Sequence, residues 1–396
     1  MKLACVVQRY GPDVTGGAEA HCRAIAERLA ETHDVTVLTS CARDYLTWRN
    51  VYPPGDSQLG RVRIKRFPVT HPRHLHHFAD LSHEVLGRRS STERQRAWFE
   101  ENGPTVPSLL EHLRAEGTSY DLVLFWSYRY YPSFFGLPIV RDRAILVPTA
   151  EEDPTVRLDV LGDFFTLPAG YVFLTEEERD LVAGRAKGPL PPSCVIGSGL
   201  GPAELPHPEL RGELENMGVS FPYALYLGRV ERNKGCDTMF RHYMRYVEEG
   251  RPDLPLVLAG PEFMEIPSHR QIRPLGFVPE HLRETLLGSA RTLIMPSPYE
   301  SLSLVLLEAW NHGVPALVNG GCKVLKGQML RANGGLYYNH ANEFVEALTL
   351  LATDEDLAIR FGAQGRTHVE TWYRWPRVLA TLEPFLASVA EARPRP

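Results

Sequence analysis

The chain has 396 residues, which at about 150 residues per domain predicts two domains and excludes a single small module. Hydrophobic residues make up 43% and charged residues 23%, proportions typical of a globular protein and not of a disordered or collagen-like chain. The formal net charge of −5 argues against a protein that binds nucleic acid through its overall field.

We interpret no segment of the sequence as a signal peptide or a membrane span. The first apolar run, Leu3–Val7, is shorter than the roughly 7–15 residues of a signal-peptide core, and the longer apolar stretches fall below the roughly 18 residues of a span. The six cysteines form no CxxC pair, as expected for reduced thiols. We therefore expect a soluble, cytoplasmic protein.

The first half of the chain alternates short apolar runs with amphipathic segments, a pattern typical of βαβ units and parallel sheets. A helix is expected within Gly16–Glu31, because apolar side chains recur at i, i+4, i+7 and i+11 from Ala18. Strands are expected at Leu3–Gln8, Asp34–Thr39, Val62–Phe67, Leu122–Phe125, Ala144–Val147, Tyr171–Leu174 and Cys194–Ile196.

The pattern restarts after Gly197–Gly212, a segment rich in glycine and proline that we interpret as an interdomain linker. Strands are expected at Tyr223–Leu227, Leu256–Ala259, Thr292–Met295 and Ala316–Val318, and helices near Asp237–Glu248, Glu280–Leu287, Leu304–His312 and Ala341–Leu351. The sequence therefore predicts an α/β protein with two Rossmann-like, parallel-sheet domains and a ligand cleft between them.

Two acidic residues, Glu300 and Glu308, stand eight positions apart. This spacing is about 800° of helical rotation and leaves them about 80° out of alignment, so we place Glu300 in a loop and Glu308 in the helix that follows. Glu308 would accept hydrogen bonds from vicinal hydroxyls such as those of a ribose. The turn and first helical residues, which are Ser301, Leu302, Ser303 and Leu304, would offer backbone N–H groups to phosphate or sugar oxygens. We expect Leu302, Ser303, Leu304 and Val305 to bind the donor. The alternative is a pair of solvated acids at a helix end.

Two cations, Arg229 and Lys234, follow the first predicted strand of the second half. Gly228 and Gly235 permit a tight path for the loop that carries them. Two positive charges beside a cleft are suited to a diphosphate that gains charge as its bond to a sugar breaks. Taken alone, the loop has a charged surface turn as its alternative interpretation.

Together these motifs resemble those of the retaining glycosyltransferases of family 4, which have the GT-B fold of two facing Rossmann-like domains. The resemblance covers nearly the whole chain. Glu300 and Glu308 match the E-x7-E element of the family, and Arg229 and Lys234 match its G-R-x4-K-G element. The resemblance implies that Glu300 contacts the donor sugar, Glu308 the nucleotide ribose, and the two cations the diphosphate, with Arg229, Lys234 and Glu300 as the catalytic residues.

The resemblance also assigns residues outside these two elements. Gly16 and Gly17 look like the glycine loop at which the backbone approaches phosphate or acceptor. The backbone around Phe277 and Val278 looks like the loop that borders the nucleobase. Glu151 stands where many members have a histidine, and we expect it to bond donor or acceptor hydroxyls or to act as a base for the acceptor; a cap or surface acid is the alternative.

The GT-B resemblance implies that the chain is divided into two domains and a C-terminal helix. Residues 1–200 are expected to form the acceptor-side domain and residues 213–370 the donor domain. Residues 371–396 are expected to form a helix that returns to the first domain.

The sequence does not favour a metal site. Five histidines within His71–His83 lack a cysteine partner and a zincin spacing, so we interpret them as part of an acceptor-side loop. The pair Asp354 and Asp356 follows a predicted helix, unlike the element of metal-dependent transferases. We expect no metal and no cofactor, with UDP or GDP as the nucleotide of the donor.

Between Arg61 and Arg96 the sequence has nine basic and three acidic residues. One interpretation is a solvated, charged face. The other is a surface for an anionic acceptor or for peripheral contact with lipid headgroups.

These observations predict a metal-independent, retaining glycosyltransferase that moves a sugar from a nucleotide diphosphate to a glycan, lipid-linked or small-molecule hydroxyl. A front-face displacement is what the resemblance implies. The alternatives are a nucleotide-sugar hydrolase or epimerase, and a catalytically silent sugar-nucleotide-binding or scaffold protein of the same fold. An NAD-dependent dehydrogenase is disfavoured because no G-x-G-x-x-G follows the first strand.

Overall fold

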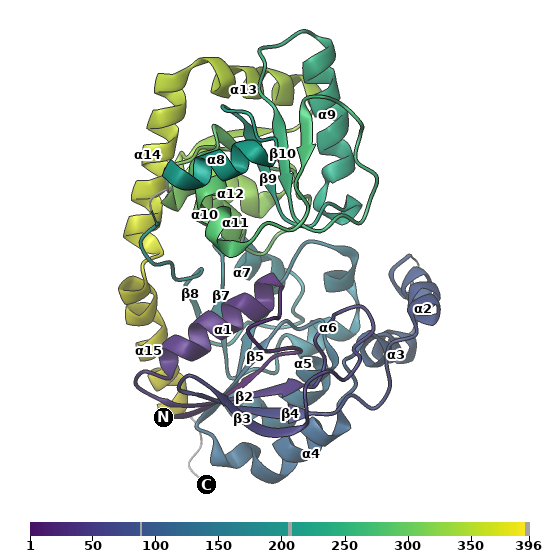
Figure 1. The fold of residues 1–396 in the computed structure, drawn as a ribbon. Coiled ribbons are helices and arrows are strands. Elements are labelled where there is room, and N and C mark those ends of the chain that lie inside the picture. The colour runs from purple at the N-terminus through teal and green to yellow at the C-terminus, as the bar shows by residue number, and fades with distance from the viewer. Residues whose placement is uncertain (88, 205–207, 393–396) are drawn as a thin grey trace. The chain divides into compact units, whose positions relative to one another are not determined.

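The computed structural model describes residues 1–87, 89–204 and 208–392. The chain divides into two compact units, each with its own helix-flanked sheet (Figure 1). The first comprises Met1–Gly199 and the chain from Val378 onward, and the second comprises Leu200–Arg377. The predicted α/β class with two sheets of mostly parallel strands is confirmed.

The first sheet has the strand order β3-β4-β2-β1-β5-β6-β7-β8, and only β3 is antiparallel to its neighbour. The strands are β1 (Lys2–Val6), β2 (Asp34–Ser40), β3 (Gly55–Leu59), β4 (Val62–Phe67), β5 (Leu122–Trp126), β6 (Ala144–Val147), β7 (Gly170–Phe173) and β8 (Ser193–Val195). Strands β5 and β6 are buried along their whole length, because helices cover both faces of a parallel sheet.

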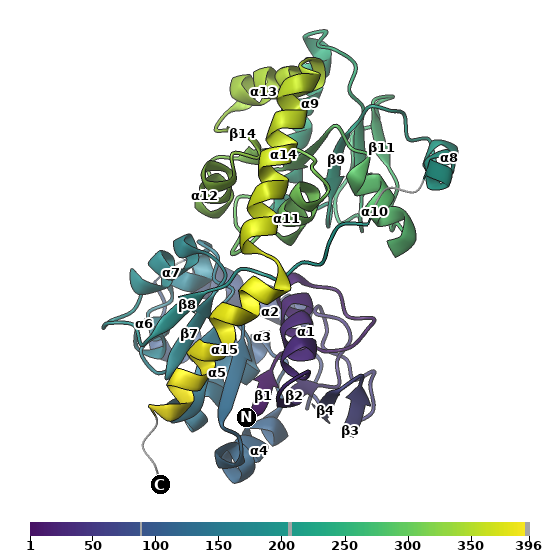
Figure 2. The same ribbon diagram turned by 90° about the vertical axis from the view of Figure 1, so that its left-hand side faces the viewer.

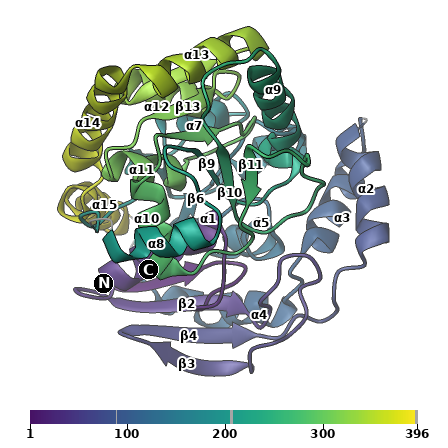
Figure 3. The same ribbon diagram turned by 45° about the horizontal axis from the view of Figure 1, so that its top comes forward.

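The helices of the first unit are α1 (Gly17–Leu29), α2 (Leu75–Gly87), α3 (Thr92–Asn102), α4 (Pro107–Glu116), α5 (Tyr131–Gly136), α6 (Val160–Phe164), α7 (Glu176–Ala183) and α15 (Trp375–Glu391) from Val378 onward. Figure 3 shows α2 and α3 side by side at one edge of this unit. Short 3-10 helices are η1 (Gly117–Ser119), η2 (Leu137–Arg143) and η3 (Pro154–Arg157).

The second sheet is parallel throughout, with the order β11-β10-β9-β12-β13-β14. Its strands are β9 (Ala224–Leu227), β10 (Leu256–Ala259), β11 (Ile272–Pro274), β12 (Thr292–Met295), β13 (Ala316–Asn319) and β14 (Gly335–Tyr338). Its helices are α8 (Pro208–Asn216), η4 (Arg232–Lys234), α9 (Cys236–Glu248), α10 (Glu280–Gly288), α11 (Leu304–Asn311), α12 (Lys323–Ala332), α13 (Ala341–Thr353) and α14 (Glu355–Trp372).

Every predicted strand is present, and the predicted helices of the second half are confirmed to within two residues at either end. The sequence missed three strands: β3, which is polar and lies at an exposed edge, β11, which is short and contains a proline, and β14, which has four residues and begins with a glycine. The linker prediction is wrong over residues 208–212, which begin α8, because proline is favoured in the first turn of a helix. Residues 205–207 of the predicted linker lie outside the described residues.

Helix α14 packs closely against α11 and α12 (Figure 2). A Cβ atom on Gly362 would lie 1.9 Å from the carbonyl oxygen of Gly313, and one on Gly365 would lie 2.3 Å from Cδ1 of Trp310. Trp310 is buried and donates its indole N–H to the carbonyl of Gly334 at 2.8 Å. Helix α14 therefore fixes α11, the helix that contains Glu308.

We expect Gly362→Ala to destabilise the protein by about 1–3 kcal/mol, because the new methyl group overlaps a backbone oxygen. Gly212→Ala in α8 is the control, since nothing lies within 4 Å of its added Cβ. That change should stabilise by roughly 0.5–1 kcal/mol through helix propensity. Chemical denaturation of both variants checks this, and equal stabilities would contradict the packing argument.

Candidate functional site

The strand order of the second sheet reverses beside β9. The chain continues from β9 to β10 and β11 on one side and then pairs β12 on the other side. In parallel α/β sheets, the loops after the carboxyl ends of such strands separate and form a ligand site. The loop after β9 contains Arg229 and Lys234, and the loop after β12 contains Glu300.

The structure brings Lys234 and Glu300 together across this point. Lys234 Nζ lies 2.9 Å from Glu300 Oε1, and the side chains are 25% and 10% exposed. The predicted positions of the two acids are confirmed, since Glu300 lies in a loop and Glu308 in α11. The partly buried ion pair makes a charged centre at the carboxyl edge of the sheet.

Glycine makes the loop after β9 fit against the loop after β12. Gly235 has φ of 75°, and a Cβ there would lie 2.3 Å from the carbonyl oxygen of Pro296. Gly228 has φ of 150°, and its carbonyl oxygen would lie 2.0 Å from a Cβ on Gly260. The approach of Gly235 to Pro296 holds Lys234 beside the loop of Glu300, and the approach of Gly228 to Gly260 packs the loop after β9 against the loop after β10.

Arg229 has a different partner in the same loop. Its guanidinium lies 3.1 Å from Glu231 Oε1, and its carbonyl oxygen accepts a 2.6 Å hydrogen bond from the Tyr226 hydroxyl. Arg229 therefore follows Gly228 directly after β9, and the buried Tyr226 fixes its backbone.

The start of α11 adds backbone donors to this edge. Leu302 and Ser303 are buried, and the Ser303 hydroxyl accepts a hydrogen bond from the Leu306 N–H at 3.3 Å. By helix geometry, the N–H groups of Leu304 and Val305 have no acceptor within α11, and such groups favour anions.

The loop after β11 reaches the same edge of the sheet, because β11 is parallel to β10. Phe277 is 77% exposed there, whereas Val278 is buried. An exposed ring above a buried aliphatic residue leaves an apolar surface next to the start of α10.

Glu308 is ion-paired, which the sequence did not predict. The Arg283 guanidinium donates from NH2 to Oε2 of Glu308, and from NH1 to Oε1 of Glu284 at 2.9 Å. Glu284 Oε2 lies 2.8 Å from Nε2 of His312. The hydrogen bond with His312 lowers the pKa of Glu284, whereas burial raises the pKa of Glu308 against the effect of Arg283. No spacing in the sequence signalled this pair, because Arg283 and Glu308 lie 25 positions apart in two different helices.

The first unit has an equivalent strand reversal beside β1. Gly16, before α1, has φ of 150°, and a Cβ there would lie 2.3 Å from Oε2 of Glu19. Glu19 accepts from Arg9 Nε at 2.8 Å, and both residues are buried. The glycine at position 16 is thus required by an internal ion pair, while Gly17 has open space around it.

Glu151 belongs to an ionic cluster at the carboxyl ends of β5 and β6. Arg129 lies 2.5 Å from Asp153 and 3.7 Å from Glu151. Ser127 and Thr149, which follow the two strands, have left-handed backbones with φ of 61° and 47°. Such conformations in residues other than glycine are unfavourable and concentrate at functional sites.

Glu178 fixes the backbone beside Glu151. Its carboxyl group is fully buried and accepts from the N–H of Ala150 at 2.6 Å and from that of Leu174 at 2.7 Å. Burial raises the pKa of Glu178 to about 8, although the backbone donors oppose this shift. The carboxyl group therefore joins the loop after β6 to the turn after β7.

A raised folded-state pKa makes the contribution of Glu178 to stability largest at low pH. It is complete below the ordinary value of 4.5 and is lost as pH rises through about 8. We expect the unfolding free energy of the wild type to fall relative to Glu178→Gln across this range. Denaturation of both proteins at pH 5 and pH 8 checks the sign; a difference that does not change with pH would contradict it.

The basic residues between Arg61 and Arg96 mostly have internal partners. Ion pairs join Arg63 to Asp34, Lys65 to Asp56 and Arg94 to Glu84. Arg66 is buried and donates to the carbonyl of Tyr10 at 3.0 Å. Residue Arg88 lies outside the described residues. These contacts favour the interpretation of the stretch as a charged, internally paired face.

Neither a cluster of metal-ligating side chains nor a membrane-spanning helix occurs in the part of the chain that the structure describes. Within residues 1–87, 89–204 and 208–392, no group of three or more His, Cys, Asp or Glu side chains is placed to hold a metal ion. Across the same ranges, no helix has the length and apolar character needed to span a bilayer.

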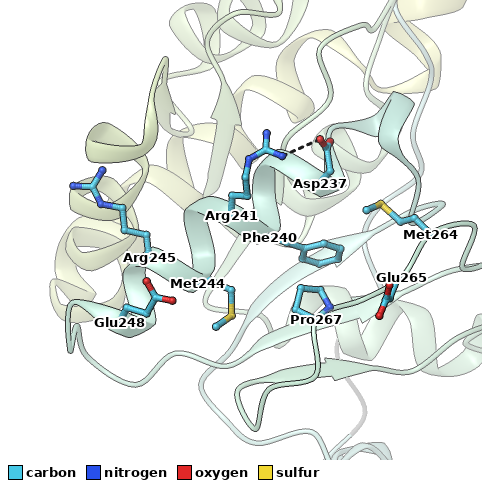
Figure 4. Close-up of a pocket in the computed structure, with 9 residues that line it drawn as sticks. All are labelled: Asp237, Phe240, Arg241, Met244, Arg245, Glu248, Met264, Glu265 and Pro267. Atoms are coloured by element: carbon cyan, nitrogen blue, oxygen red, sulfur yellow. Dashed lines mark hydrogen bonds and ion pairs between the residues drawn. The ribbon is translucent and has the colours of Figure 1, made fainter.

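A hollow of about 420 Å³ lies between α9 and the segment that follows β10 (Figure 4). Its wall includes Phe240, Met244, Met264 and Pro267. None of the predicted site residues lines it.

The two sheets define the fold class. The solved structure of Anabaena HepE in complex with UDP and glucose matches this chain with a TM-score of 0.70 at 13% identity, covering 98% of this chain and 100% of that one. The fold is GT-B, as predicted.

Residues 219–368 match the model of the family described as glycosyl transferases group 1. O-antigen chain mannosyltransferase B of Escherichia coli is 35% identical over 105 residues, which span 24% of this chain and 28% of that protein. An uncharacterized glycosyltransferase of Methanocaldococcus jannaschii is 24% identical over 343 residues, 81% of this chain and 80% of that protein. Residues 219–368 therefore form a domain of the glycosyl transferases group 1 type within a chain of GT-B fold.

Proposed function

We propose that this protein transfers a sugar from a nucleotide diphosphate to a hydroxyl acceptor with retention at the anomeric carbon. The observation that carries the proposal is the Lys234–Glu300 pair, which lies at the strand reversal of the second sheet. The match of residues 219–368 to the group 1 glycosyltransferase model supports sugar transfer. The complex of HepE with UDP and glucose supports a nucleotide-sugar donor, with UDP or GDP as the nucleotide.

In the proposed reaction, this chain's own charges stabilise the leaving group. Lys234, Arg229 and the backbone N–H groups at the start of α11 hold the diphosphate, so that no divalent ion is required. Glu300 contacts the donor sugar beside Lys234. Interactions that strengthen as the diphosphate gains charge lower the barrier more than they lower the energy of the bound donor.

The proposed displacement occurs on one face of the sugar. The bond from the anomeric carbon to the diphosphate oxygen breaks, and the bond to the acceptor oxygen forms on the same side. The acceptor proton passes to the departing diphosphate oxygen, so no protein nucleophile is needed.

We place the acceptor on the first unit. Glu151 and the backbone at Gly17 lie at the carboxyl edge of its sheet, where small-molecule sites form in this class of fold. The relative named for the O-antigen chain favours a glycan acceptor, lipid-linked or free, and a cytoplasmic location is part of the proposal.

A panel of UDP-, GDP- and ADP-sugars tests the proposed function. A donor at 100 times its dissociation constant should stabilise the protein by roughly 2.7 kcal/mol, seen as a raised melting temperature. Sugar transfer should then require an added acceptor. Stabilisation by none of the donors contradicts the proposal, product without acceptor indicates a hydrolase or epimerase, and binding without any product indicates a silent binding protein.

We expect Lys234→Ala to lower turnover at saturating donor by about 10- to 100-fold, because it removes a charge-assisted hydrogen bond worth about 1.5–3 kcal/mol. Lys187→Ala is the control, since Lys187 forms a 2.8 Å ion pair with Asp163 in the first unit. Steady-state kinetics of both variants check this. Unchanged turnover in Lys234→Ala would remove the lysine from the mechanism.

A further inference from the structure

We propose that Arg283 is a positioning residue that holds the Glu308 carboxylate for the ribose hydroxyls of the donor nucleotide. The proposal rests on the function proposed above. It adds a residue that strengthens the preference for nucleotides with ribose hydroxyls, and this residue lies outside both sequence motifs.

The two oxygens of Glu308 have different surroundings. Oε2 accepts a hydrogen bond from Arg283, whereas no hydrogen bond or ion pair within the described part of the chain engages Oε1. The Glu308 side chain is 24% exposed. Arg283 thus fixes one oxygen and leaves the other as an acceptor for a ligand donor such as a hydroxyl group.

Three helices fix the position of Arg283. Arg283 and Glu284 lie in the first half of α10, and Glu284 contacts His312 at the end of α11 at 2.8 Å. The carbonyl of His312 accepts a 2.7 Å hydrogen bond from Arg366 of α14. The chain of contacts orients the guanidinium toward Glu308, so the carboxylate is set before a ligand arrives.

Charge makes Glu308 dependent on Arg283. Glu284 and Glu280 also act on Glu308, and both are acidic. Without the arginine, a mostly buried carboxylate would face two like charges, which favours its protonated form or its rotation away. A neutral carboxyl group accepts hydrogen bonds less strongly than a carboxylate.

A purely structural role for Arg283 makes a different prediction. If the arginine only joins α10 to α11, its loss should weaken the binding of all nucleotides alike. If it positions Glu308, its loss should remove the preference for ribose hydroxyls and leave the binding of a nucleotide without them nearly unchanged.

The experiment compares UDP with 2′,3′-dideoxy-UDP by calorimetry, or the matching GDP or ADP pair if the donor screen selects that base. We expect the wild type to bind the ribonucleotide about 10- to 100-fold more tightly than the dideoxy nucleotide. In Arg283→Gln this ratio should fall below about 3, and Arg283→Lys should restore part of it because it keeps the charge.

Two further variants make the test specific. Glu308→Gln should lose the same preference, and adding Arg283→Gln to it should lower the ratio no further, because both changes act on one interaction. Arg251→Gln is the matched control: Arg251 also bridges two carboxylates, Glu249 and Glu346, and should keep the wild-type ratio.

The outcomes separate this inference from the function on which it rests. Binding of no nucleotide by the wild type overturns the proposed function. A wild type that binds both nucleotides equally, or an Arg283→Gln variant with the wild-type ratio, overturns the inference alone. If Arg283→Gln does not fold, Arg283→Lys and Glu308→Gln decide the test. The inference is overturned if both variants keep the wild-type ratio of affinities for the ribonucleotide and the dideoxy nucleotide.

Discussion

Strands β9 and β12 lie side by side in the second sheet, and the chain leaves them toward opposite sides. This single topological constraint brings the two loops that follow the strands to one edge. The close approach of Gly235 to Pro296 and the Lys234–Glu300 pair both depend on it. So does the direction of α11, whose N-terminus opens at the same edge because the helix continues from the loop after β12.

The position of Glu308 depends on a second layer of packing. Helix α11 is buried between the sheet and α14, and Trp310 occupies the space that the glycines of α14 leave open. A helix held in this way has little freedom to rotate, so the polar face that contains Glu308 and His312 stays directed at α10. The buried contacts among Arg283, Glu284 and His312 are satisfied in full only at this one orientation, which makes the arrangement specific.

The strands, the helices and the motifs could largely be predicted from the sequence, but the interaction partners of the site residues could not. Parallel strands buried on both faces are continuous apolar runs, which is why Leu256–Ala259 and Thr292–Met295 were predicted with the observed bounds. The Lys234–Glu300 contact joins residues 66 positions apart, and pairing at that distance depends on tertiary structure. Arg283 was missed because only the packing of α10 on α11 directs it at Glu308.

The three charged pairs of the candidate donor site are formed within the chain itself. Lys234 is shared with Glu300, Arg229 with Glu231, and Glu308 with Arg283. In the proposed reaction, an incoming diphosphate competes with a carboxylate for each of these cations, which moderates its affinity in the ground state. As the bond to the sugar breaks, the diphosphate gains negative charge and competes better for Lys234. The pairing thus shifts binding energy from the ground state toward the transition state, where it increases the rate.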